Sequence, residues 1–335
     1  MNMNTRIIRH AGLIPLLLCI VAVGAFSGGK SEQKPSGKSI AEPLQKLSLA
    51  TGGTAGTYYP IGAAIANVIT KYVDGVEVTA ESTGASVANL KMIVDKKVDM
   101  ILSAANTALG AYQGEAPFDK PIKNIRGITA LYPETFQFVV LKASGLKSLS
   151  DLKGKKVVVG APGSGTERTA KLLLEALGIT YNDIKPQFLS FAEGVTALKD
   201  RLVDCAIVGA GIPTSAVVDA ATSLDITLLN VEQEAFQKVA KDSPYLMQVK
   251  IPAGTYRGLD KDVISVASPA LLIVREDLSI DTVYKITAGI FGHLVEIQAS
   301  HAQAKNISLE NALQGMSVPL HPGAEKFYKE KGVIK

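Results

Sequence analysis

Short runs of β-branched and apolar residues alternate with amphipathic stretches through most of the chain. Residues 47–51 predict a strand, residues 52–56 a glycine-rich turn, and residues 57–72 a helix. The apolar residues of that helix recur at helical spacing and share one face: Ile61, Ile65, Val68 and Ile69. Further elements follow in the same order, namely strands at 76–82 and 98–102 and a helix at 85–95. Strands interleaved with helices predict an α/β fold, with mostly parallel sheets flanked by helices.

The middle of the chain repeats this order of elements. The repeat consists of strands at 156–160, 184–189 and 204–208, a glycine-rich turn at 161–165, and helices at 166–177 and 193–202. Val98-Asp99 and Val203-Asp204 occupy equivalent places, as do Thr57 and Thr166 after their turns. The repeat favours two lobes of like design over one large sheet. The alternative is a chance likeness between generic strand–helix–strand units.

Two long extended runs are predicted to link the lobes, residues 136–141 and 263–274. Beyond them the pattern predicts a helix at 280–299 and a helical tail from Leu309. If both runs cross a cleft, lobe one comprises residues 47–137 plus 268–335 and lobe two comprises residues 138–267. Each lobe is then a mostly parallel sheet flanked by helices, and the two crossing segments join them. The loops at the carboxyl ends of the strands face such a cleft, which is where these folds bind ligands.

The N-terminus carries a targeting pattern. Arg6 and Arg9 precede an apolar run at 11–26, which is typical of a secretory signal peptide over residues 1–25. The run is short for a membrane span. Two alternatives stay open: an uncleaved anchor helix, and lipid attachment at Cys19, which is disfavoured because Leu rather than a small residue precedes it. Each of the three places the remainder of the chain outside the cytoplasmic membrane, in the periplasm or on the outer face of that membrane.

Composition narrows the class of protein. Hydrophobic residues make up 47% of the chain and charged residues 20%, which excludes intrinsic disorder. Two Cys exclude a disulfide scaffold, and Cys205 lies in an apolar run typical of a core. A net charge of +4 does not argue for a nucleic-acid partner, and we expect none. Residues 26–46 are rich in Ser, Gly, Pro and Lys and predict a flexible tether.

Each lobe offers a glycine-rich turn between a strand and a helix, and each turn ends in hydroxyl residues. The first N–H groups of a helix lack internal partners and carry partial positive charge, and Gly lets a ligand approach the backbone. Two such turns facing one cleft would bind a carboxylate or phosphate without an Arg, whereas either alone could be an ordinary turn and cap. Other polar residues follow strands, and Glu134 lies just before the first crossing run. The predicted ligand-binding residues are Thr54, Gly56, Thr57, Tyr58, Ser86, Asn89, Asn106, Ser164, Gly165, Thr166 and Gly211.

The sequence does not match the enzyme motifs that its glycines and histidines suggest. Gly160 and Gly165 have the spacing of a P-loop. Thr166 and Glu167, however, stand where that loop needs Lys and Ser or Thr. The body of the chain has three His without the spacing of a zinc site: His293, His301 and His321. We therefore expect no catalytic residue, no cofactor and no metal. A secreted two-lobed α/β enzyme acting on a small acid stays as the alternative, and a surface adhesin is a third hypothesis.

Several segments resemble the TAXI-type solute receptors of TRAP transporters. The turn at 52–62 (GGTAGTYYPIG) and residues 82–89 (STGASVAN) are similar to the hallmarks of that family. Residues 132–134 (YPE), 151–155 (DLKGK) and 160–167 (GAPGSGTE) agree with it in order and spacing. The resemblance extends over roughly residues 47–300, which makes it specific.

The resemblance implies a type II periplasmic-binding-protein fold and extracytoplasmic capture of a small organic acid. It implies a glutamate-like ligand or a dicarboxylate such as 2-oxoglutarate, and delivery to a sodium-coupled TRAP permease by a monomeric receptor. Relatives often carry Gln and Asp where this chain has Ala104 and Asn106, and loss of an acid there is expected to change the ligand charge that the site favours. The contacts implied by matching position are Thr54, Thr57, Tyr58, Ser86, Asn89, Ser164 and Thr166.

Overall fold

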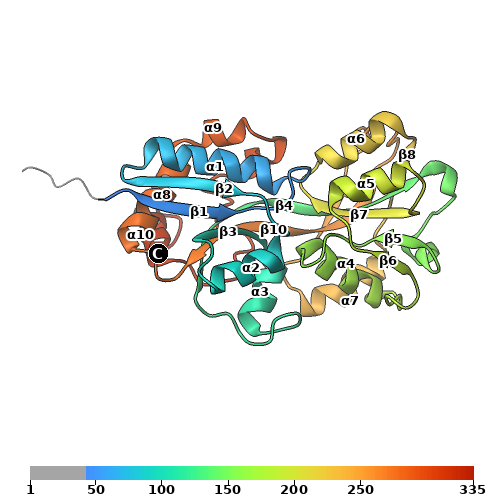
Figure 1. The fold of residues 1–335 in the computed structure, drawn as a ribbon, viewed down its shortest axis with the longest axis horizontal. Helices are drawn as coiled ribbons and strands as arrows, with labels where there is room; N and C mark the ends of the chain where they lie inside the picture. The colour runs from blue at the N-terminus through green and yellow to red at the C-terminus, as the bar shows by residue number, and fades with distance from the viewer. Residues whose placement is uncertain (1–42) are drawn as a thin grey trace, which may run out of the picture. The chain divides into compact units, whose positions relative to one another are not determined.

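A ten-stranded mixed sheet runs through residues 43–335, the part of the chain that the computed structural model describes (Figure 1). Hydrogen-bonded neighbours follow the order β2-β1-β3-β10-β4-β7-β5-β6, with β8 paired to β4 and β9 to β10. The predicted signal peptide, Cys19 and the predicted tether as far as residue 42 lie outside the described residues. The strands are β1 (Gln45–Ala50), β2 (Val76–Glu81), β3 (Met100–Ala104), β4 (Ile125–Leu141), β5 (Lys156–Val158), β6 (Lys185–Gln187), β7 (Cys205–Ala210), β8 (Ile226–Leu229), β9 (Met247–Ile251) and β10 (Val263–Arg275).

Helices cover both faces of the sheet, which confirms the predicted α/β fold (Figure 1). Within the described residues, no helix is both long and apolar enough to cross a bilayer. The helices are α1 (Tyr58–Tyr72), α2 (Ser86–Val94), α3 (Ala105–Gln113), α4 (Gly165–Ala176), α5 (Phe191–Lys199), α6 (Ser215–Ser223), α7 (Gln233–Asp242), α8 (Ile280–Gly292), α9 (Leu294–Gln298) and α10 (Pro322–Glu330). Short 3-10 turns are η1 (Lys142–Ser144), η2 (Leu149–Leu152) and η3 (Ala302–Asn306).

Four apolar clusters form the core, two on each half of the sheet. On the half that holds β1–β3, one cluster packs α1, α8 and α10 against one face, and another packs α2 and α3 against the other. On the half that holds β5–β7, α4 and α7 cover one face, and α5 and α6 cover the other. We call these halves lobe one and lobe two. The core passes from one to the other between Tyr132 and Phe136 on β4 and between Val266 and Ala270 on β10. The lobe boundaries at 137 and 268 stay predictions, which this division of the core supports.

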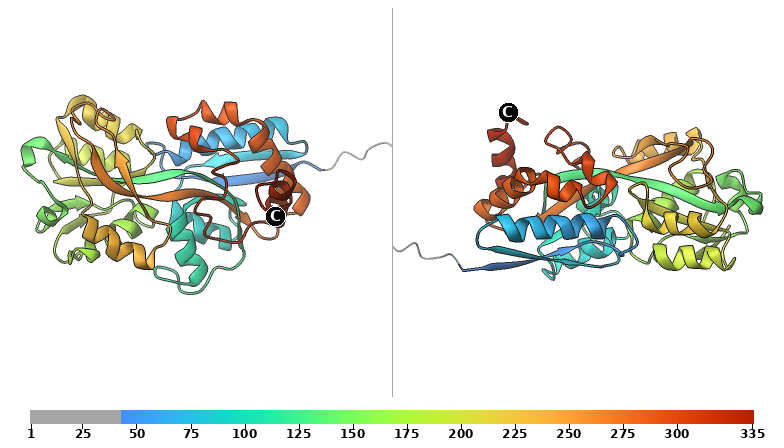
Figure 2. Two further views of the ribbon diagram at one scale, coloured as in Figure 1. Left: turned by 180° about the vertical axis from the view of Figure 1, so that it is seen from behind. Right: turned by 90° about the horizontal axis from the view of Figure 1, so that it is seen from above.

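β4 and β10 are the long strands that belong to both lobes, and they pair antiparallel side by side (Figure 2). β4 begins at Ile125 rather than at residue 136, so the first crossing run is longer than predicted. Pro133 lies opposite Pro269, and the register shifts between Pro269 and Leu271. Because proline has no N–H to donate, neither residue of this pair can donate to the ladder, which is weakened at this point.

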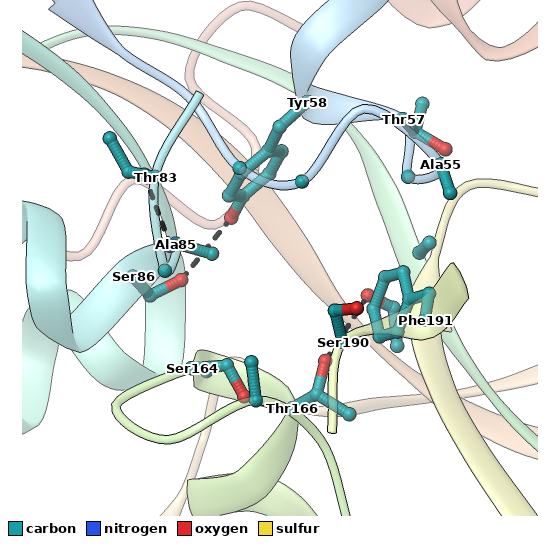
Figure 3. Close-up of a pocket in the computed structure, with 18 of the residues that line it drawn as sticks. Ala55, Thr57, Tyr58, Thr83, Ala85, Ser86, Ser164, Thr166, Ser190 and Phe191 are labelled. Atoms are coloured by element: carbon teal, nitrogen blue, oxygen red, sulfur yellow. Dashed lines mark hydrogen bonds between the residues drawn. The ribbon is translucent and has the colours of Figure 1, made fainter. Parts of the chain in front are cut away.

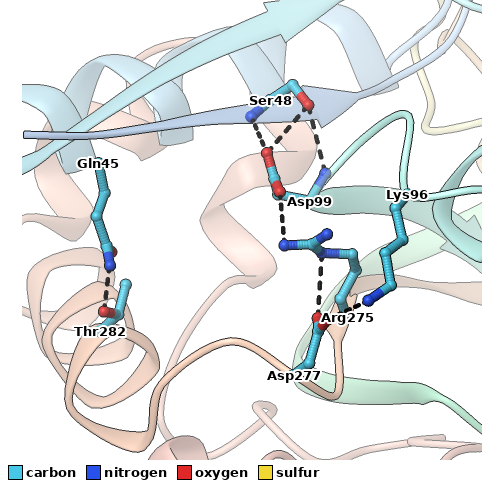
Figure 4. Close-up of polar contacts among 7 residues, drawn as sticks. All are labelled: Gln45, Ser48, Lys96, Asp99, Arg275, Asp277 and Thr282. Atoms are coloured by element: carbon cyan, nitrogen blue, oxygen red, sulfur yellow. Dashed lines mark hydrogen bonds and ion pairs between the residues drawn. The ribbon is translucent and has the colours of Figure 1, made fainter.

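The predicted Val-Asp repeat has the same structural role in both lobes. Asp99 accepts a hydrogen bond from the backbone N–H of Ser48 at 2.9 Å, at the start of the central strands of lobe one (Figure 4). Asp204 accepts the equivalent bond from Lys156 N at 2.8 Å in lobe two. Asp99 also forms an ion pair with Arg275 at 3.1 Å, which ties β10 to this corner of lobe one. The two lobes therefore share a local design.

Two helix predictions and one boundary were wrong. The helix expected over 280–299 breaks at His293, whose backbone leaves the helical region (φ −130°, ψ 34°) and whose ring stacks on Tyr72 with centroids 3.5 Å apart. The tail from Leu309 forms turns as far as Gly315, which adopts φ +73°, and becomes helical only at α10. β1 begins at Gln45, so the last residues of the predicted tether belong to the sheet.

Candidate functional site

A cavity of about 230 Å³ lies between the lobes and is lined from both sides. Lobe one supplies the turn before α1, the start of α2 and part of β4, and lobe two supplies the starts of α4 and α5 and the end of β7. In Figure 3, Tyr58 and Ser86 lie across the cavity from Ser164 and Thr166. The lining is Gly52, Gly53, Thr54, Ala55, Gly56, Thr57, Tyr58, Ser82, Thr83, Gly84, Ala85, Ser86, Tyr132, Glu134, Ala161, Ser164, Gly165, Thr166, Ser190, Phe191, Ala192, Gly209 and Ala210.

Four helices begin at this cavity. The first residues of α1, α2, α4 and α5 all line it. Each of these helix starts offers backbone N–H groups and a partial positive charge. Their convergence creates a site for an anion without a cationic side chain.

The helix starts differ in how their own caps are satisfied. Ser164 accepts a hydrogen bond from Glu167 N at 3.0 Å, and Ser190 forms a reciprocal capping box with Glu193. Thr57, at the start of α1, makes no such cap; its hydroxyl donates to Gly211 O at 3.3 Å. The start of α2 also lacks a side-chain cap, because Ala85 precedes it. The first N–H groups of α1 and α2 therefore receive no side-chain oxygen from their own caps and can donate to a ligand.

Ala85, before α2, has an unusual backbone conformation. Its dihedral angles are φ 69° and ψ −151°, a region that residues other than Gly rarely adopt. A hydrogen bond from Ala85 N to the Thr83 hydroxyl at 3.1 Å holds this turn in place. The strained turn directs the start of α2, including Ser86, towards the cavity.

Glu134 is the only Asp, Glu, Lys, Arg or His among the lining residues. Glu134 on β4 is 6% exposed, and its Oε1 atom is buried without a hydrogen-bond partner. Burial raises the pKa of Glu134 to about 8, and a hydrogen bond from Tyr58 partly opposes that rise. The hydroxyl of Tyr132 is likewise buried without a partner, and burial raises its pKa well above 10.0. The cavity thus combines four helix starts with one buried acid.

The lobes touch each other directly at the edges of the cavity. Ala88 N donates to Gly163 O at 3.0 Å, and Ala216 N donates to Ala55 O at 3.3 Å. Gly165 packs so closely on lobe one that a Cβ there would lie 2.7 Å from the Ser86 hydroxyl oxygen. The described structure is therefore that of two lobes brought into contact.

Eight of the predicted ligand-binding residues come together around this cavity, and three do not. Asn89 is wholly buried, and its amide bonds to Thr51 O at 2.7 Å and Leu102 O at 2.8 Å. Asn106 bonds to Thr169 at 2.8 Å, and Gly211 faces Gln303. These three hold the walls in place rather than line them. The eight are Thr54, Gly56, Thr57, Tyr58, Ser86, Ser164, Gly165 and Thr166; their contact with a ligand stays a prediction.

Sequence reasoning left several lining residues out of the predicted site. Glu134 was grouped with the polar residues after strands, but nothing in the sequence marks it as buried. Ser190 had a usable signal, because Ser190 and Glu193 have the spacing of a capping box. Tyr132 and Glu134 belong to the segment 132–134 that resembles TAXI-type receptors, so that resemblance was a usable signal for both. Phe191 adds apolar surface to the cavity, and nothing in the sequence marked it.

The histidines and acids of the described residues do not form a metal site. No group of three or more His, Cys, Asp or Glu side chains within residues 43–335 is placed to hold an ion. His301 accepts a hydrogen bond from Gln303 N at 3.1 Å, and His321 accepts one from Gly323 N at 3.1 Å. Both rings therefore cap short helical segments.

Comparison with known proteins gives a family and a fold. The sequence model of the NMT1-like family matches residues 49–332. PhnD1 from Prochlorococcus marinus MIT 9301, in complex with methylphosphonate, is similar with a TM-score of 0.51 at 13% identity, covering 86% of this chain and 99% of PhnD1. A protein from Bordetella bronchiseptica RB50 is similar with a TM-score of 0.51 at 20% identity, covering 85% of this chain and 88% of that protein. The alkanesulfonate-binding protein SsuA from Xanthomonas axonopodis pv. citri, bound to MOPS, has a TM-score of 0.48 at 14% identity, covering 86% of this chain and 85% of SsuA.

Proposed function

The chain belongs to the NMT1-like family, and on that premise we propose that it is an extracytoplasmic receptor for a small organic acid. The ligand binds between the two lobes, and a membrane permease receives it. The receptor releases its ligand chemically unchanged. PhnD1, which shares the fold, holds methylphosphonate, and this supports a small anion as the class of ligand.

The observation that carries this proposal is the convergence of four helix starts on one cavity shared by both lobes. An anion bound there accepts hydrogen bonds from both lobes at once. It therefore stabilises the arrangement in which the lobes touch, since a ligand shifts a conformational equilibrium only towards the state that it binds better. The weak point where Pro133 faces Pro269 lies between the two lobes and is the proposed hinge.

The finer proposal is a glutamate-like or dicarboxylate ligand and a sodium-coupled TRAP permease. It rests on the resemblance of the glycine-rich turn at 52–62 and of residues 160–167 to TAXI-type receptors. Residues of both segments line the cavity, which supports the proposal because sequence motifs shared by a receptor family are expected where the ligand binds. A monomeric, exported receptor with lobe boundaries near residues 137 and 268 completes the proposal.

Thermal unfolding with a ligand panel tests the receptor function. The protein is first unfolded and refolded to remove bound molecules, then melted with amino acids, carboxylates, sulfonates and phosphonates. A ligand at about 100 times its Kd adds about 2.7 kcal/mol to the free energy of unfolding, so the melting temperature rises. If no acid in the panel raises it, the receptor proposal is wrong.

Uptake into proteoliposomes tests the type of permease. A TRAP permease reconstituted with this receptor is expected to accumulate the ligand only when a sodium gradient is present. If the TRAP permease accumulates none of a ligand that this receptor binds, even with a sodium gradient, the TRAP assignment is wrong and the receptor function stands.

A further inference from the structure

A buried carboxyl group with one unpaired oxygen stands in the wall of the cavity. The Oε1 atom of Glu134 makes no hydrogen bond, although the side chain is more than nine-tenths buried. A buried polar atom left unpaired destabilises a fold, and a buried carboxylate does so more than a neutral group. Asn89, also buried beside the cavity, shows the contrast: its amide bonds to three backbone carbonyls and its oxygen accepts from Thr83. Asn89 therefore has a complete structural role, and Glu134 does not.

No cation of the described chain compensates Glu134. The lining residues include no Lys, Arg or His. The titratable groups that act on Glu134 are Tyr58 from α1 and Tyr132 from its own strand, and both are phenols. The hydroxyl of Tyr132 also lacks a partner. Two orphan polar groups therefore border the same cavity, and a molecule bound in it can satisfy both.

We propose that Glu134 is the specificity-determining residue of the cavity and selects a ligand that carries an ammonium group beside its carboxylate. This rests on the proposed receptor function and narrows its ligand to a 2-amino acid, as opposed to a 2-oxo acid or a simple dicarboxylate. The carboxylate of the ligand lies at the helix starts, and the ammonium donates to Glu134. A 2-oxo acid of the same length presents a carbonyl oxygen, which only a protonated Glu134 could satisfy.

The two modes of binding differ in what happens to one proton. In the ligand-free protein the pKa of Glu134 is about 8, so near pH 7 the carboxyl is mostly protonated. An ammonium favours the ionised form, so an amino acid displaces about nine-tenths of a proton near pH 7, and its affinity rises as the pH approaches 8. A 2-oxo acid requires the protonated form; it displaces no proton, and its affinity falls as the pH rises through 8.

Calorimetric titration of matched ligands tests the proposal. The refolded protein is titrated with L-glutamate and 2-oxoglutarate, L-alanine and pyruvate, and L-leucine and 4-methyl-2-oxopentanoate, each in buffers of different ionisation enthalpy to count protons. In the pair that binds, the amino acid is expected to bind at least about 10-fold more tightly at pH 8 and above, where Glu134 is ionised, and to release a proton near pH 7. Glu134→Gln is expected to weaken the affinity for the amino acid by about 10- to 150-fold and to change the affinity for the 2-oxo acid by less than about threefold.

Two results would overturn the proposal. A 2-oxo acid that binds as tightly as its amino partner, without proton release, refutes it while leaving the receptor function intact. Full retention of amino-acid affinity by Glu134→Gln refutes it as well. If no member of any pair binds, the proposal that the protein is a receptor for carboxylic acids is wrong, and so is the proposed role of Glu134. The comparison of ligands and the proton count use the unaltered chain, so they stand even if the variant fails to fold.

Discussion

Replacing Glu134 with Gln should stabilise the ligand-free protein, and increasingly so at higher pH. Below about pH 4.5 the carboxyl is protonated in both the folded and the unfolded chain, so Glu and Gln are nearly equivalent. Between 4.5 and about 8 the unfolded chain ionises while the folded chain does not, so folding of the unaltered protein becomes less favourable as the pH rises. Above about 8 the difference levels off.

The size of the effect follows from the pKa. One pKa unit corresponds to about 1.4 kcal/mol, so the rise from 4.5 to about 8 predicts a gain of about 4–5 kcal/mol for Glu134→Gln at the plateau. Urea unfolding of the refolded protein across this pH range measures it. Glu193→Gln is the control, and its effect on stability is expected to have the opposite sign. Hydrogen bonds from Ser190 lower the pKa of Glu193, so this variant is less stable than the unaltered protein at neutral pH, and the difference disappears at low pH. A difference between Glu134→Gln and the unaltered protein that does not change with pH would refute the reasoning.

Three further outcomes follow from the geometry. Gly165→Ala adds a Cβ 2.7 Å from the Ser86 hydroxyl oxygen and should weaken ligand binding by about 5- to 150-fold in a titration, the equivalent of about 1–3 kcal/mol. Gly292→Ala is the control, because Gly292 lies outside the cavity lining and a Cβ there meets nothing within 4 Å; equal losses would contradict the contact between lobes. Ala85→Gly should raise the free energy of unfolding by about 1 kcal/mol, because it relieves the strain at φ 69°, and a loss of stability would show that this backbone is unstrained. Cys205 should resist iodoacetamide in the native protein and react with it in urea, because burial raises the pKa of its thiol. Peptide mapping locates the label, and rapid labelling of the native protein would contradict the place of Cys205 in the core.

The periodicity of the sequence was enough to predict the α/β class. It favoured two lobes over one large sheet, whereas the strands form one ten-stranded sheet, because β4 and β10 run through both lobes. The apolar face of α1 was predicted at Ile61, Ile65, Val68 and Ile69, and all four are buried. Local patterns predict such faces well because burial against a sheet requires them at every turn of the helix. The break at His293 could not be predicted in this way, because it accompanies stacking on Tyr72, a residue far away in the sequence.

The site was partly predictable for the same physical reason. Glycine-rich turns before helices have a local signature, so the residues of both turns were found at the cavity. Whether a polar residue after a strand faces a cavity or bonds to the wall depends on the packing of distant strands. Asn89 was expected at the ligand and bonds to Leu102 O, whereas Glu134 lies on β4, opposite Ser268 of β10, with its Oε1 atom buried and unpaired.

Native mass spectrometry tests the central claim most directly, that one small acid is held by both lobes. The refolded protein is sprayed with the tightest acid from the ligand panel, alongside a variant carrying Thr57→Val and Thr166→Val, one hydroxyl removed from each lobe. The unaltered protein is predicted to carry one bound acid per chain, and the folded variant to carry none. An adduct of equal intensity on the variant, or none on the unaltered protein, would contradict the account.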